Sequence, residues 1–221
     1  MADFDSADLL ARCRRYAARP SVDEAFGDSA WYALLTEAEA RWLPMLAIHD
    51  PGSMYGAPTQ LSSDDGGYTY QLTEEPLALE LYTSVNGNPL FPGAYSDPEA
   101  DYVLEGDEIR MVRGRARDFS DGPYARWISP PAAINASTAS QIQPARHRML
   151  LVYDALEKWA SVGGHMDPTY WRHLLQATLY GDPEIPGDVG IIGSAKRRDF
   201  ARGMAAYAHG GQGYRWWRPN G

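Results

Sequence analysis

Residues 57–72 have the sequence APTQLSSDDGGYTYQL, and this stretch decides the fold class. Two short runs of the kind found in strands, 57–62 and 67–72, flank the turn-forming segment Ser63-Asp64-Asp65-Gly66. In the second run, Tyr68 and Tyr70 alternate with polar residues, as in a strand with one buried face. The pattern therefore predicts a β-hairpin joining the two runs.

Short apolar and aromatic runs separated by turn residues continue from residue 54 to residue 131. Further strands are predicted at 77–84, 102–104, 108–112 and 124–129. The segment Asn86-Gly87-Asn88-Pro89 predicts a turn after the first of these. Together the runs predict a small antiparallel sheet of about five or six strands.

Helical periodicity flanks this β-rich middle on both sides. Before it, helices are predicted at 6–18 and 29–49; Thr36-Glu37-Ala38-Glu39 forms a capping box that predicts a restart, and Pro44 predicts a kink. After it, the patterns predict helices from Pro144 to about Val162 and from Asp167-Pro168 to about Gly181, a loop at 183–193, and a short basic helix at 194–208.

The predicted fold is α+β. Both chain ends form a helical bundle, a small antiparallel sheet is inserted between them, and an extended arm follows. The expected segments are N-terminal helices at 1–53, a β-rich region at 54–131, C-terminal helices at 132–182 and a basic, aromatic arm at 183–221.

Composition excludes several protein classes. The chain has 221 residues, 44% of them hydrophobic and 22% charged, which is ordinary for a globular protein. No apolar run is long enough to span a membrane, and the acidic start of the chain does not resemble a signal peptide. The single cysteine, Cys13, lies on an apolar stripe and is expected to be an inert core residue.

The formal net charge of −9 is unevenly distributed. Residues 194–221 contain six basic residues and one acidic residue, a net +5, so the preceding 193 residues carry −14. An acidic body repels nucleic acid at long range, whereas a basic segment is attracted to any acidic surface, including another copy of the chain. A solvated terminus and an arm that docks on a neighbour are both open interpretations.

No motif predicts catalysis, a metal site or a cofactor. The five histidines, His49, His147, His165, His173 and His209, show no helical metal-site spacing. A nucleophile elbow and a phosphate-binding loop are both absent. Asp64-Asp65 is expected to serve turn geometry, and the glycines at 187, 190 and 193 are expected to form a loop. The protein is therefore expected not to be an enzyme.

Two charged or aromatic segments are candidates for partner contacts. Glu105, Asp107 and Glu108 precede Arg110, Arg113, Arg115 and Arg117; local ion pairs or a partner-facing ridge would each explain this pattern. The second segment combines Trp, Tyr and Arg, the residues that dominate interface energetics, and it either docks on a partner or packs on its own domain. The predicted arm residues are Lys196, Arg197, Arg198, Arg202, Tyr214, Arg215, Trp216, Trp217 and Arg218.

Three patterns together give the chain a family resemblance. The first is Trp31-Tyr32-x-x-Leu35-Thr36-Glu37-Ala38, followed by Trp42 and an Ala-Ile-His-Asp-Pro helix end. The second is Ala57-Pro58 with Leu61 and Asp65-Gly66-Gly67-Tyr68-Thr69-Tyr70. The third is Arg126-x-x-x-Pro130-Pro131, a Ser/Thr linker, and Arg146-x-x-Met149-Leu150-x-Val152-Tyr153. Between about Asp23 and Gly164 the chain resembles the head–tail connector, or adaptor, proteins of tailed bacteriophages.

The resemblance implies a structural virion protein. It implies a ring, usually of twelvefold symmetry, that assembles in the host cytoplasm, sits beneath the portal protein in the virion neck and contacts a stopper or tail-completion protein. Packaged DNA would pass through the ring without sequence-specific binding. The final 28 residues depart from the family pattern, so their partner stays open. The alternative is a non-enzymatic tail or neck binding module that uses the β-rich region.

Overall fold

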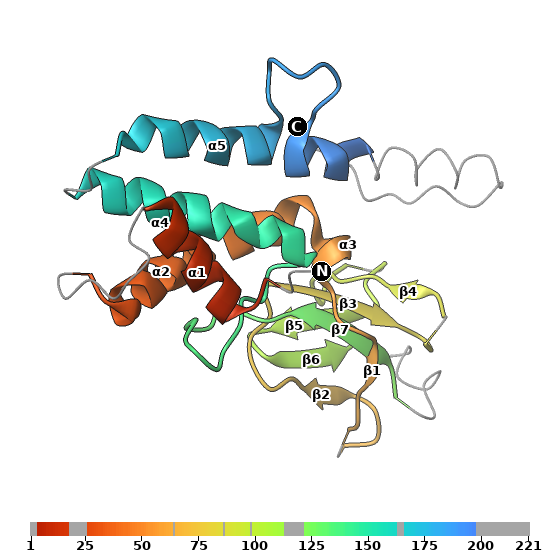
Figure 1. Ribbon diagram of the computed structural model, residues 1–221. Coiled ribbons are helices and arrows are strands. Elements are labelled where there is room, and N and C mark those ends of the chain that lie inside the picture. The colour runs from red at the N-terminus through yellow and green to blue at the C-terminus, as the bar shows by residue number, and fades with distance from the viewer. Residues whose placement is uncertain are drawn as a thin grey trace. The chain divides into compact units, whose positions relative to one another are not determined.

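The computed structural model describes residues 4–17, 26–63, 65–85, 87–97, 99–112, 122–162 and 166–197. The chain is α+β and divides into two compact units. Residues 1–38 and 146–221 form a helical unit, and residues 39–145 form a β-rich unit. Each unit is described by itself below (Figure 1).

The helical unit contains α1 (Ser6–Tyr16), the start of α2 (Asp28–His49), α4 (Met149–Ser161) and α5 (Pro168–Tyr180). Helix α4 packs against α1 and along α5 (Figure 1). The predicted start of α5 is confirmed, because the Asp167 side chain accepts a hydrogen bond from Thr169 N at 2.8 Å. Asp5 caps α1 in the same way, through Asp8 N.

Aromatic side chains fill much of the core of the helical unit. The Trp31 ring lies 5.9 Å from the ring of Trp159 and 4.7 Å from that of Phe26. The Trp171 ring stacks on that of Tyr153, with ring centres 6.4 Å apart, and is tilted against that of Tyr16 at 5.9 Å. Such tilted and edge-on pairs add to the stabilisation that burial of the rings provides.

Helix α2 is continuous through Thr36 and Pro44, so the predicted restart at Thr36 is wrong. The Thr36 hydroxyl donates instead to the carbonyl of Tyr32, four residues earlier, at 2.8 Å. This back-bond is the alternative open to a threonine inside a helix, where no capping site exists. The helix ends at His49, as predicted, and a four-residue helix, α3 (Pro51–Met54), follows the turn at Asp50.

The β-rich unit contains two antiparallel sheets rather than the single predicted sheet. The first sheet has the order β1–β7–β3–β4, formed by Thr59–Gln60, Tyr124–Ile128, Ala78–Tyr82 and Pro89–Leu90. The second has the order β2–β6–β5, formed by Thr69–Gln71, Glu108–Met111 and Tyr102–Glu105. The strands predicted near 78, 102, 108 and 124 are confirmed, whereas β4 falls where only a turn was expected.

The predicted hairpin between 57–62 and 67–72 is wrong. Strand β1 pairs with β7, and β2 pairs with β6, so the two runs belong to different sheets. Backbone hydrogen bonds just beyond the two strands follow the same pairing. Leu61 N, after β1, donates to Pro123 O, and Leu72 N, after β2, donates to Asp107 O. The turn between the runs was predicted from local residues, but its flanking strands find partners far away along the chain.

Side-chain alternation brings the two sheets onto one core. Leu81, Leu90 and Ala125 from the first sheet and Tyr70 and Ile109 from the second belong to the same buried cluster. The residues between them along each strand point away from this core, as a period of two requires. The outward-facing residues carry the polar sites considered next.

The remaining described elements are short. A 3₁₀ turn at Ala145–Arg148 leads into α4, and residues 190–197 are helical. The predicted loop at 183–193 therefore ends at 189, and the predicted basic helix begins earlier than residue 194. The rest of that predicted helix, 198–208, lies outside the described residues.

Candidate interaction surface

Within the part of the chain that the structure describes, the histidines do not gather into one site. His49 and His173 are exposed on different units, and His147 is buried in the 3₁₀ turn. No cluster of three or more His, Cys, Asp or Glu suited to a metal ion occurs among the described residues. His165 and His209 lie outside them. Cys13 is fully buried, and this burial raises the pKa of its thiol.

Asp65 organises the turn before β2. Its Oδ1 accepts hydrogen bonds from the Ser63 hydroxyl at 2.5 Å, Thr69 N at 2.9 Å and Tyr68 N at 3.0 Å. These bonds, that of Ser63 first, lower the pKa of the Asp65 carboxyl. Such an arrangement confirms the expected turn role for Asp65, whereas Asp64 lies outside the described residues.

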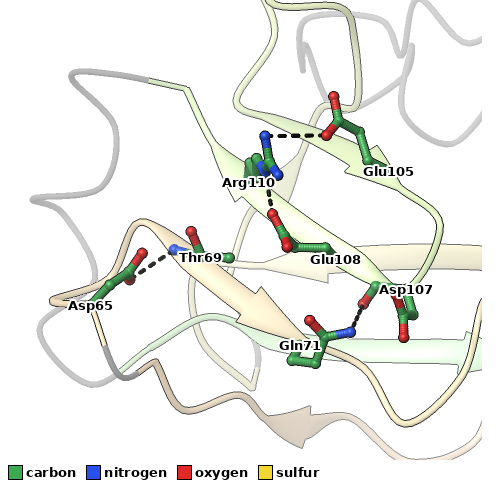
Figure 2. A network of polar contacts seen from close by, with 7 residues as sticks. All are labelled: Asp65, Thr69, Gln71, Glu105, Asp107, Glu108 and Arg110. Atoms are coloured by element: carbon green, nitrogen blue, oxygen red, sulfur yellow. Dashed lines mark hydrogen bonds and ion pairs between the residues drawn. The ribbon is translucent and has the colours of Figure 1, made fainter.

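The outward face of the β2–β6–β5 sheet is polar (Figure 2). The β2–β6 register places Thr69 opposite Arg110 and Gln71 opposite Glu108. The β5–β6 register places Glu105 opposite Glu108 on the other side of β6, so all five side chains share this face. Arg110 makes an ion pair with Glu105 at 3.3 Å and another with Glu108. The hydrogen bond to Glu108, followed by contacts with Tyr95 and Glu105, raises the Arg110 pKa.

Carboxylates collect at the β5–β6 turn end of this sheet. Asp107 lies at the turn, and Leu72 N donates to its carbonyl at 2.8 Å, which brings the end of β2 beside it. Glu74 and Glu75 come soon after Leu72 in the sequence, separated from it by one threonine. We call Glu74, Glu75, Glu105, Asp107 and Glu108 the acidic end of the sheet.

Only part of the acidic end is neutralised. Arg110 pairs with Glu105 and Glu108, but the carboxylates of Glu74, Glu75 and Asp107 have no hydrogen-bond or ion-pair partner among the described residues. The predicted acidic cluster at the turn thus has the local pairing expected with Arg110. Arg113, Arg115 and Arg117 lie outside the described residues.

The acidity of the protein is concentrated in the β-rich unit. Its described residues contain twelve acidic side chains but only three basic ones, Arg41, Arg110 and Arg126. The acidic ones are Glu39, Asp50, Asp65, Glu74, Glu75, Glu80, Asp97, Glu99, Asp101, Glu105, Asp107 and Glu108. The described residues of the helical unit are almost balanced, with ten acidic and nine basic side chains.

A second polar cluster lies on the outward face of the other sheet. Arg126 Nε and Nη2 both donate to Glu80 Oε2, at 2.7 and 2.6 Å, and the Tyr82 hydroxyl donates to the same oxygen. The guanidinium also lies 4.9 Å from the centre of the Tyr55 ring and 5.2 Å from that of Tyr82. Burial, with the bond to Glu80 next in size, raises the pKa of Tyr82 to about 12. This cluster holds Tyr55 over the sheet, and within it the charges of Glu80 and Arg126 neutralise each other.

Most of the predicted arm lies outside the described residues. Lys196 and Arg197 are exposed in the helical segment 190–197. Arg198, Arg202, Tyr214, Arg215, Trp216, Trp217 and Arg218 all fall beyond residue 197.

Large apolar side chains are exposed around β4. Val85, Phe91 and Tyr95 have 52%, 45% and 54% of their surface exposed, within a span of eleven residues. Isolated exposed apolar residues are normal, but several along one short segment are typical of a contact surface.

No family model matches the chain, and a search of curated proteins finds no match. No helix within the described ranges has the length and apolar character needed to cross a membrane.

Proposed function

We propose that this protein is a structural component of a tailed-bacteriophage neck, a head–tail adaptor. In this proposal it acts without catalysis and without a cofactor. It forms a ring beneath the portal protein, extends the DNA channel and meets a stopper or tail-completion protein. Assembly takes place in the host cytoplasm, and the mature location is the virion.

The observation that carries the proposal is the separation of charge. The β-rich unit holds the excess of acidic side chains, and the net charge of 194–221 is +5. When two different surfaces of one chain are complementary, copies join head to tail, and such contacts close into rings when the rotation permits. An acidic ring also lets DNA pass without binding it.

The residues that carry the family resemblance support the proposal through their structural roles. Trp31 packs between Phe26 and Trp159, Tyr70 is buried in the shared core, and Arg126 holds Tyr55 over the sheet. Motifs that maintain a scaffold are what a structural virion protein requires. In the finer architecture that we propose, both chain ends form a helical bundle, the β-rich unit is inserted between them in the sequence, and the basic C-terminal residues form an extended arm.

A second candidate is a tail or neck binding module that uses the β-rich unit. The exposed side chains of Val85, Phe91 and Tyr95 favour it, because they supply an apolar contact surface there. Such a module would bind its partner without forming a ring.

The deciding experiment measures the mass of the purified protein alone and mixed with the portal protein of the same phage, by native mass spectrometry and electron microscopy. An adaptor gives a ring of defined copy number on the portal. A protein that stays monomeric and never joins portal particles would overturn the adaptor proposal. Binding of single copies to a tail protein, without a ring, would favour the second candidate.

A further inference from the structure

We propose that the acidic end of the β2–β6–β5 sheet is the docking surface for the basic C-terminal segment, residues 196–218, of a second copy of this chain. The inference rests on the proposed function, because it names the contact by which neighbouring copies join. It goes further by assigning both sides of that contact.

Charge complementarity identifies the two sides. The acidic end carries five carboxylates, and Arg110 is the one basic residue that pairs with them among the described residues, which leaves an excess of four negative charges. Residues 196–218 contain Lys196, Arg197, Arg198, Arg202, Arg215 and Arg218 against the single acidic residue Asp199. The docking segment therefore has an excess of five positive charges, close to the four negative charges that are in excess at the acidic end.

The local structure leaves the acidic end available to a partner. Glu105 and Arg110 expose 48% and 46% of their side chains, and Glu75 and Asp107 are exposed as well. The carboxylates of Glu74, Glu75 and Asp107 have no partner among the described residues, so a guanidinium can pair with them without breaking any ion pair that those residues make.

Chain length allows the contact. From the last described residue, 197, to Arg218 the chain has 21 further residues, and an extended chain of that length reaches roughly 70 Å. A three-stranded sheet is only about 10 Å across in the hydrogen-bonding direction. The basic segment is thus long enough to leave its own helical unit and cross the acidic end of another copy.

The segment also carries residues suited to strengthen the contact once charge has brought the copies together. Tyr214, Trp216 and Trp217 stand beside Arg215 and Arg218. Aromatic residues and arginine provide the largest contributions to binding at protein interfaces. Charge then governs encounter and register, while the aromatic rings slow dissociation.

The test uses the full-length chain and measures self-association by sedimentation equilibrium at about 0.05 M and about 0.5 M salt. The first variant, E74Q/E75Q/D107N, removes the three carboxylates that have no described partner. We expect it to weaken self-association about tenfold at the lower salt concentration, as the loss of a few exposed ion pairs predicts. Circular dichroism verifies that each variant is folded.

The matched control is E37Q/E157Q/E184Q, which removes three exposed or half-buried carboxylates from the helical unit and changes the net charge equally. It should leave self-association unchanged. An equal loss in the control would overturn the proposed surface, because total charge and not position would then govern association.

Exchanging the charges of the two surfaces provides the decisive experiment. The variant E74K/E75K/D107K and the variant K196E/R197E/R215E should each fail to self-associate, while an equimolar mixture of the two should associate, since each basic surface then meets an acidic one. Absence of rescue in the mixture would overturn the inference.

The failure of this inference can be distinguished from failure of the adaptor proposal. If the wild-type chain forms portal rings but the acidic-end variants do so equally well, this contact is wrong and the adaptor proposal stands. Failure of the wild type to join portals refutes the adaptor proposal itself.

Discussion

The Glu80–Arg126 pair offers a quantitative test of how the outward face of the β1–β7–β3–β4 sheet is stabilised. Arg126 donates to Glu80 at 2.6 and 2.7 Å and lies against the rings of Tyr55 and Tyr82. Both charged side chains are about one third exposed, which places the pair between a surface and a buried ion pair. The substitution R126M keeps the apolar stem and removes the charge, both hydrogen bonds and both cation–π contacts.

The expected size follows from these contacts. An ion pair with this exposure contributes about 0.5–1 kcal/mol, and a guanidinium over an aromatic ring contributes about 0.5–1 kcal/mol for each of the two rings. We therefore expect R126M to lower the free energy of unfolding of the β-rich unit by about 1.5–3 kcal/mol. A double-mutant cycle with E80Q isolates the ion pair, for which a coupling energy of about 1 kcal/mol is expected.

The assay is urea unfolding of the wild type, R126M, E80Q and the double variant. Hydrogen exchange at the β7 amides accompanies it, because these amides report opening of the β-rich unit alone. The matched control is the same cycle on Arg110 and Glu108, which lie two residues apart on strand β6 of the other sheet and where the arginine side chain is 46% exposed. Its coupling should be indistinguishable from zero. A Glu80–Arg126 coupling below about 0.3 kcal/mol would refute the reasoning, because the pair would then behave as an ordinary exposed one.

Three further outcomes are expected. L81A, at a fully buried core position, should lower the free energy of unfolding by about 2–5 kcal/mol, whereas L77A, at a 37% exposed position, should change it little in the same urea titration. Because its folded-state pKa is raised to about 12, Tyr82 contributes stability that is present below pH 10 and is lost as the pH rises towards 12. The Y82F substitution should reduce this loss of stability and remove one late step from the tyrosinate absorbance titration. The fully buried thiol of Cys13 should react with a thiol reagent only after unfolding, and rapid reaction in the native protein would contradict its burial.

Local signals in the sequence predicted the elements that depend on neighbouring residues. Asp167-Pro168 marks the start of α5 because the capping side chain and the proline act within one turn. The strand at 77–84 was predicted from its own apolar alternation, and β3 occupies its centre. The continuous path of α2 was missed at Thr36, where a capping-box pattern occurs inside a helix whose apolar face continues on both sides.

Pairing between distant segments could not be predicted in the same way. The residues at 57–62 and 67–72 alternate correctly for strands, but alternation does not specify a partner, and the actual partners begin near residues 124 and 108. The candidate surface depends on this same pairing. Glu74 and Glu75 lie about thirty residues before Asp107, and only the β2–β6 register brings them to one end of a sheet. The sequence identified the cluster at 105–108 but carried no signal that two more carboxylates would join it.

The proposed docking between copies would have a consequence for the proposed passage of DNA, because net charge is conserved. Pairing a basic segment with an acidic end neutralises the contact locally, but every copy brings both partners and keeps its net charge of −9. A ring of any copy number, as proposed, would therefore stay acidic as a whole, and the remaining acidic side chains of the β-rich unit would still repel a polyanion. In this proposal, the same distribution of charge allows both attraction between subunits and repulsion of DNA. A chain of the same net charge with its charges evenly mixed would still repel DNA but would lose the attraction between copies, because neither surface would then differ from the other.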